Sequence, residues 1–117
     1  AITHSCCLTA MDLGATAILA ATKSGYTAKV ISRYRPACTI VAVCQSEQTR
    51  RQLAISWGVH PYLTGEVDST DRLFSMTVDV ARKEGAVKCG DTVVITAGVP
   101  IGRSGSTNLI KAQVVGE

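Results

Sequence analysis

Residues 17–28 read AILAATKSGYTA, and this stretch decides the fold. Its first part, Ala17 to Ala21, is apolar throughout, which predicts a buried strand of a parallel sheet, since such strands are covered on both faces. A polar turn follows, and a helical pattern begins after it. A strand that leads through a turn into a helix N-terminus favours anion binding, because helical N–H groups and the helix dipole point outward there.

The turn itself carries groups suited to phosphate. Thr22, Ser24 and Thr27 offer hydroxyl donors, Lys23 offers a positive charge, and Gly25 gives a flexible backbone. The stretch is not a Walker P-loop, because Lys23 precedes its only glycine. Two interpretations stay open on local grounds, a phosphate cradle and an ordinary capping turn.

The length and composition limit the possible fold, ligand and localisation of the protein. With 117 residues, 46% hydrophobic and 18% charged, the chain is expected to form one globular domain. A net charge of +3 suits a small anionic ligand, and an aromatic content of 4% argues against nucleic acid. No apolar run has the length of a membrane span and no signal peptide opens the sequence, so we expect a cytoplasmic protein without a membrane partner. The sequence opens in mid-element, as expected of a fragment of a longer chain.

Hydrophobic periodicity predicts the element order α-β-α-β-α-β-α-β-β. Helices are expected over residues 2–13, 28–34, 47–57 and 70–84, and strands over residues 17–21, 38–44, 59–63, 92–97 and 109–115. Ser46 is expected to cap the third helix, with Leu53, Ala54 and Trp57 on its inner face. Ser69 or Thr70 is expected to cap the fourth helix, and the residues expected on the inner face of that helix are Leu73, Phe74, Thr77, Val80 and Ala81. Such alternation predicts an α/β fold with a mostly parallel sheet and an antiparallel last strand.

A second donor-rich loop, Gly98–Asn108, follows the fourth predicted strand. It carries three glycines, and its Arg103 can hold a phosphate through two hydrogen bonds. Ligands of open α/β sheets bind beyond the carboxyl ends of the strands, where both this loop and Thr22–Thr27 begin. Together the loops favour one ligand with two anionic ends, or with a phosphate and a sugar; the alternative is a solvated hairpin loop.

The cysteines and histidines indicate no metal site. Five cysteines, an odd number at irregular spacing and without a CxxC pair, fit reduced buried thiols. His4 and His60 are expected to be structural or surface residues. A Cys-x5-Arg run from Cys44 to Arg50 permits a phosphatase, with a low-pKa thiolate as nucleophile. This alternative is disfavoured, because the run has no glycine and Glu47 places a carboxylate where the anion would lie.

Six pieces, in this order and spacing, resemble the C-terminal domain of pyruvate kinase, of bacterial type. They are Thr22–Thr27, Ser32–Pro36, Ile40–Val43, Trp57–Val59, Gly90–Gly98 and Ser104–Asn108. The resemblance implies a three-layer α/β/α domain with a five-stranded mixed sheet. It also implies a regulatory role, in a parent enzyme of glycolysis that transfers a phosphoryl group from phosphoenolpyruvate to ADP. The Mg²⁺ and K⁺ of that reaction bind on other domains, so no catalytic residue, metal ligand or cofactor is expected here.

The resemblance also implies which residues bind an allosteric effector. The first loop would hold a phosphate, and the second would close over the other end of the ligand. The expected effector-binding residues are Thr22, Lys23, Ser24, Gly25, Thr27, Arg103, Ser104, Gly105 and Ser106. The effector stays open among fructose 1,6-bisphosphate, AMP, ribose 5-phosphate and glucose 6-phosphate. The second phosphate of a bisphosphate would need a tryptophan and an arginine before and at the start of the fourth helix, and only Arg72 fits, approximately.

A further expectation concerns assembly. In the family that this chain resembles, the last strand pairs with its twin across a two-fold axis, which implies a homotetramer that uses Leu109–Val115 and adjacent helices. The other expected partners are the catalytic domains of the parent chain. An uncovered strand edge invites such pairing, so a module for assembly alone, without its own ligand, is the second alternative.

Overall fold

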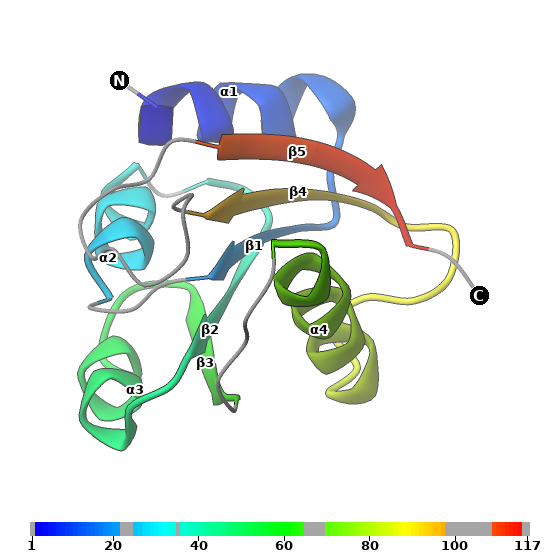
Figure 1. The fold of residues 1–117 in the computed structure, drawn as a ribbon. Coiled ribbons are helices and arrows are strands. Elements are labelled where there is room, and N and C mark those ends of the chain that lie inside the picture. Colours follow the sequence, from blue (N-terminus) through cyan, green and yellow to red (C-terminus); the bar gives the residue numbers. More distant parts are fainter. Residues whose placement is uncertain (1, 22–24, 35, 65–69, 98–108, 116–117) are drawn as a thin grey trace.

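The computed structural model describes residues 2–21, 25–34, 36–64, 70–97 and 109–115. Helices and strands follow one another along the chain in the expected order (Figure 1). The helices are α1 (Ile2–Leu13), α2 (Tyr26–Arg33), α3 (Glu47–Leu53) and α4 (Thr70–Lys83). The strands are β1 (Ala17–Ala21), β2 (Thr39–Cys44), β3 (Val59–Leu63), β4 (Thr92–Ala97) and β5 (Leu109–Val114).

The five strands form one sheet in the order β3-β2-β1-β4-β5. Strand β1 pairs in parallel with β2 and β4, and β2 pairs in parallel with β3. Strand β5 runs antiparallel to β4, with Leu109 opposite Ala97 and Val114 opposite Thr92. The predicted mixed sheet, mostly parallel with an antiparallel last strand, is confirmed. The β3 strand, which contains Pro61, lies at a sheet edge as expected.

Helices cover both faces of the sheet, which confirms the three-layer α/β/α architecture. Ile18 and Ala20 of β1 pack in the cluster formed with α1, α2 and α3, whereas Ala17 and Leu19 pack in the cluster formed with α4. All four residues are fully buried. The apolar character of β1 therefore has a simple cause, since a helical layer lies against each of its faces.

The third helix is shorter than predicted. It ends at Leu53, and the next residue, Ala54, is its exposed C-cap. The chain then turns, with Ser56 N donating to Leu53 O at 3.0 Å and Val59 N donating to Ser56 O at 3.3 Å. The expected inner-face position of Trp57 is wrong, because its side chain is 46% exposed. Of the three expected inner-face residues, only Leu53 is buried.

Helix α4 follows the prediction, with one difference in which residues face the core. Leu73, Phe74, Thr77 and Ala81 face the core as expected, but Val78 is buried there while Val80 is only half-buried. Of the two expected caps, Ser69 lies outside the described residues, and Thr70 is the first residue of α4. Within the described part of the chain, no helix combines the length and the apolar character that crossing a membrane requires.

Candidate functional site

The carboxyl ends of the four parallel strands meet at one edge of the sheet. The strand order reverses there, because β2 and β3 lie on one side of β1 and β4 lies on the other. In open α/β sheets, ligands bind at this kind of reversal, beyond the strand ends. In the sequence, the last residues of β1 and β4, Ala21 and Ala97, directly precede the two predicted effector loops, residues 22–27 and 98–108.

Helix α2 begins at this edge, directly after the first predicted loop. Its N-cap is Gly25, which has left-handed backbone angles of φ 85° and ψ −4°. The first backbone bond of the helix joins Lys29 N to Gly25 O at 3.0 Å. Thr27, in the first turn, is buried with 5% exposure. The positive end of the helix dipole therefore lies at the carboxyl edge of the sheet, where it favours an anion.

The N-cap of α2 lies directly against α3. A Cβ atom on Gly25 would lie 3.2 Å from the Cγ2 atom of Thr49 and 3.3 Å from Cδ2 of Leu53. Both φ and this close approach therefore require glycine at position 25. Sequence reasoning did not single out Thr49 as a neighbour of the loop, and no local pattern reveals a contact between residues 24 positions apart.

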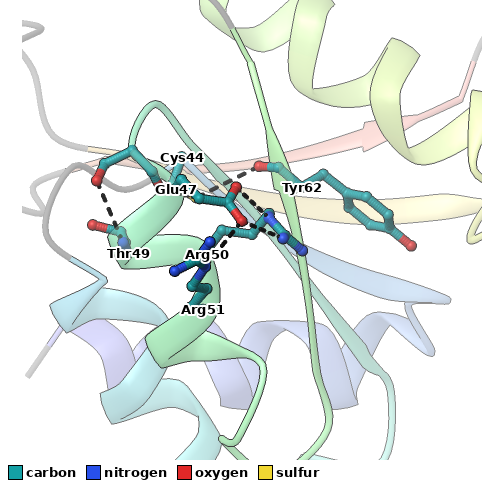
Figure 2. A network of polar contacts seen from close by, with 7 residues as sticks. Cys44, Glu47, Thr49, Arg50, Arg51 and Tyr62 are labelled. Atoms are coloured by element: carbon teal, nitrogen blue, oxygen red, sulfur yellow. Dashed lines mark hydrogen bonds and ion pairs between the residues drawn. The ribbon is translucent and has the colours of Figure 1, made fainter.

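The network around Cys44 contradicts the phosphatase alternative (Figure 2). The Cys44 thiol is fully buried, 3.6 Å from the carbonyl oxygen of Tyr62 and 3.8 Å from that of Ser46, and it can donate weakly to either. Burial raises the pKa of this thiol above its ordinary value, although the nearby Arg50 acts in the opposite direction. A nucleophilic thiolate requires a lowered pKa and an accessible sulfur, so this one is unsuited to the task.

The arginine of the Cys-x5-Arg run is also engaged elsewhere. Its Nε donates to Oε2 of Glu47 at 2.8 Å, and Nε of Arg51 lies 3.3 Å from the other oxygen of the same carboxylate. Hydrogen bonds from Arg50 are the main reason why the pKa of Glu47 falls to about 2. The predicted cap is confirmed, since Ser46 Oγ accepts from Thr49 N at 3.4 Å. The run is thus a capped, ion-paired helix start.

The described residues offer no alternative metal or disulfide chemistry. All five cysteines are free thiols, with Cys6, Cys7 and Cys44 buried and Cys89 exposed. Among the residues that the structure describes, no group of three His, Cys, Asp or Glu side chains could hold a metal ion. His4 is exposed and stacks on Tyr34 with ring centroids 5.1 Å apart, and His60 is exposed, as expected for surface histidines.

Comparison with known proteins decides the family. Residues 1–113 match the family model described as "Pyruvate kinase, alpha/beta domain". The chain belongs to this family. It is 50% identical over 116 residues to a pyruvate kinase of Lactobacillus delbrueckii subsp. bulgaricus, a match that covers 99% of this chain and 20% of the relative.

Two further relatives named pyruvate kinase agree with this assignment. That of Clostridium acetobutylicum is 50% identical over 109 residues, covering 93% of this chain and 23% of the relative. That of Staphylococcus aureus is 49% identical over 109 residues, covering 93% of this chain and 19% of the relative. The chain thus spans about a fifth of the length of the curated relatives it matches.

Most of the predicted effector residues of this pyruvate kinase domain fall outside the described part of the chain. These are Thr22, Lys23, Ser24, Arg103, Ser104, Gly105 and Ser106. The described members are Gly25, the N-cap of α2, and Thr27, in the first turn of α2. The effector-binding assignment of all nine residues stays a prediction. The residues that directly precede the two predicted loops are described: Ala21 ends β1 and Ala97 ends β4, and both lie at the carboxyl edge of the sheet.

One buried polar group near this edge was not predicted. Thr96, the penultimate residue of β4, is fully buried, and among the described groups its Oγ1 has no hydrogen-bond partner. The Thr96 Cα is paired with that of Ala20 on β1 and that of Ile110 on β5. The sequence Thr-Val-Val-Ile-Thr-Ala gives no indication of this, because threonine is a common strand residue.

Proposed function

We propose that this domain is the regulatory C-terminal part of a pyruvate kinase and binds a phosphorylated effector between residues 22–27 and 98–108. The observation that carries the proposal is the reversal of strand order between β1 and β4. In the sequence, both donor-rich segments directly follow the carboxyl ends of these neighbouring strands, and α/β sheets bind ligands beyond such strand ends, which supports a shared ligand.

The chemistry of the two segments supports a phosphorylated ligand. The first contributes Lys23 and three hydroxyl groups and leads into the N-terminus of α2, whose dipole favours negative charge. The second contributes Arg103, which can bind a phosphate through two hydrogen bonds, together with flexible glycines. A sugar phosphate or a nucleoside monophosphate has the size and charge to contact both.

The relatives support the wider part of the proposal. They carry the name pyruvate kinase and are about five times as long as this chain. We infer a longer cytoplasmic protein in which other domains transfer a phosphoryl group from phosphoenolpyruvate to ADP, a step of glycolysis, with Mg²⁺ and K⁺. This domain would contact those catalytic domains and transmit effector binding to them.

Calorimetric titration tests the effector site directly. The ligand panel is fructose 1,6-bisphosphate, glucose 6-phosphate, ribose 5-phosphate, AMP and inorganic phosphate. Wild type is expected to bind one organic phosphate saturably, and Lys23→Ala is expected to weaken it by about 1.5–3 kcal/mol, the contribution of a charged donor. Lys29→Ala is the matched control, because it removes the same charge from within α2, six residues further along the chain.

Each outcome of the titration either supports or contradicts the proposed effector site. Loss of binding in Lys23→Ala with retention in Lys29→Ala supports the cradle. Equal affinity of Lys23→Ala and wild type would show that the first loop does not hold the phosphate. Absence of saturable binding to the whole panel would refute an effector site that forms in this chain.

A second function, subunit assembly, is favoured by a separate observation. Strand β5 ends the sheet, and α1 lies beside it (Figure 1). Large apolar side chains are exposed on both elements: Val114 of β5 is 61% exposed, and Met11 of α1 is 70% exposed. An open strand edge next to exposed apolar side chains fits pairing with a second copy of the chain.

Sedimentation velocity tests the assembly proposal. Met11→Glu is expected to lower the fraction of dimer or tetramer, because it places a charge in an apolar contact. Ile55→Glu is the control, since Ile55 is 90% exposed but belongs to the turn before β3, at the opposite edge of the sheet. A wild-type chain that stays monomeric at high concentration would refute assembly through this domain alone.

A further inference from the structure

Two side chains of α3, those of Thr49 and Leu53, lie close to Gly25. An ideal Cβ position on Gly25 lies 3.2 Å from Cγ2 of Thr49 and 3.3 Å from Cδ2 of Leu53, so a larger residue would have to displace these side-chain atoms by a few tenths of an ångström. Thr49 is 8% exposed and Leu53 is fully buried, so both side chains are packed inside the protein. The start of α2 is therefore held in place by the helix that follows the next strand.

The first turn of α3 is stabilised by contacts within the helix. Ser46 caps it, and Glu47 binds both Arg50 and Arg51 along its surface (Figure 2). Two residues before Ser46, the buried thiol of Cys44 lies close to the carbonyl oxygens of Ser46 and of Tyr62 in β3. The two Cys44 contacts join the end of β2 to β3 and to Ser46, the N-cap of α3, whose first turn contains Thr49.

We propose that Thr49 is a positioning residue for the anion site, acting through its Cγ2 methyl group on the N-cap of α2. This inference rests on the proposed function, because it concerns the affinity of the 22–27 segment for phosphate. The site would then be built by two helices, with α2 supplying the N-terminus and α3 setting where that N-terminus lies.

The physical reason is the short range of the interactions involved. Hydrogen bonds to a phosphate weaken outside a donor–acceptor distance of about 2.7–3.2 Å, and the helix-dipole effect is confined to the first turn. A few tenths of an ångström of freedom at Gly25 therefore reduces how many donors can reach one phosphate together. The methyl group of Thr49 limits this freedom, because it lies 3.2 Å from the position that a Cβ atom of residue 25 would occupy.

Two variants of Thr49 test the proposal. Thr49→Ser removes the methyl group and keeps the hydroxyl, whereas Thr49→Val keeps the methyl group and removes the hydroxyl. Affinity is measured by calorimetry with the same panel of five phosphate compounds. Thr49→Ser is expected to bind the preferred compound about three- to tenfold more weakly, a loss within the range of one deleted contact. Thr49→Val is expected to bind as wild type does.

Amide hydrogen exchange gives a second readout that needs no ligand. Thr49→Ser is expected to speed exchange of the Lys29 amide, which donates to Gly25 O, while the amides of α1 and α4 stay unchanged, and Thr49→Val is expected to leave all of these amides unchanged. A uniform rise in exchange across the helices, with unaltered affinity, would overturn the positioning role. So would the reverse pattern, in which Thr49→Val binds weakly and Thr49→Ser binds normally, because it assigns the effect to the hydroxyl.

The two readouts also separate this inference from the proposed function. If wild type binds no member of the panel, the proposed function fails, and an inference about affinity fails with it, even if exchange shows that Thr49 holds the first turn of α2. If wild type binds and both variants of Thr49 match it in affinity, the proposed function stands and the positioning role is refuted.

Discussion

Replacement of Gly25 by alanine is the sharpest test of how the start of α2 is held. The substitution adds one Cβ atom at a position where φ is 85° and where two side-chain atoms of α3 lie 3.2 and 3.3 Å away. Two separate costs follow, one from the backbone conformation and one from the contact with Thr49 and Leu53. Each can be estimated by itself.

The backbone cost is about 1–2 kcal/mol, since alanine is strained in the left-handed region. The extra methyl group adds about 1–3 kcal/mol in a packed environment, toward the lower end here because the neighbouring methyl groups can shift by a few tenths of an ångström. Alanine also restricts the unfolded chain, which offsets about 0.4–1 kcal/mol. The expected net loss in the free energy of unfolding is about 2–3 kcal/mol.

Urea denaturation followed by far-ultraviolet circular dichroism measures this loss. With a slope of about 1.5 kcal/mol per molar urea, the midpoint is expected to fall by about 1.5 M. Gly85→Ala is the matched control, because Gly85 has a φ of 79° but no atom within 4 Å of its added Cβ. That variant keeps only the backbone cost, so its loss is expected near 1 kcal/mol. Equal losses in the two variants would refute the contact between Gly25 and α3.

Three further substitutions give predictions for stability, two of a loss and one of a gain. Glu47→Gln is expected to lower the urea midpoint at pH 7, and the difference from wild type is expected to narrow as pH falls from 4.5 toward 2. The reason is that the Glu47 pKa is about 2 in the folded state, below its ordinary value of 4.5. Thr96→Val is expected to raise the free energy of unfolding by about 1 kcal/mol, because it removes a buried hydroxyl with no partner among the described groups. Thr77→Val is expected to lower it by about 1 kcal/mol, since Thr77 Oγ1 donates to Leu73 O at 2.7 Å.

The architecture could be predicted from the sequence because its main determinants are local. The apolar segments at residues 17–21 and 92–97 carry the pattern of strands buried on both faces, and each is fully or almost fully buried in the structure. The absence of a predicted helix between the last two strands indicated their antiparallel pairing, which the structure has. Short-range patterns of this kind carry the element order and most of the topology.

The end of α3 could not be predicted in the same way. Ala54 and Trp57 continue the apolar spacing of Leu53, so periodicity alone places them on the inner face. The structure ends the helix at Leu53, and Ser32 Oγ, from α2, donates to the carbonyl oxygen of Trp57 at 2.6 Å. A tertiary hydrogen bond thus helps to hold the backbone of the turn, and the indole is left 46% exposed.

The candidate site shows the same division between local and tertiary information. Its donors are visible in the sequence, because lysine, hydroxyl and glycine residues are adjacent in Thr22–Thr27. Its support is not, because Thr49 reaches Gly25 only after β2 has brought α3 alongside the start of α2. Residue types in a loop can therefore indicate which ligand it favours, while the affinity also depends on a packing contact from another helix. If Thr49 has this role, substitutions in α3 will tune effector binding without touching the ligand.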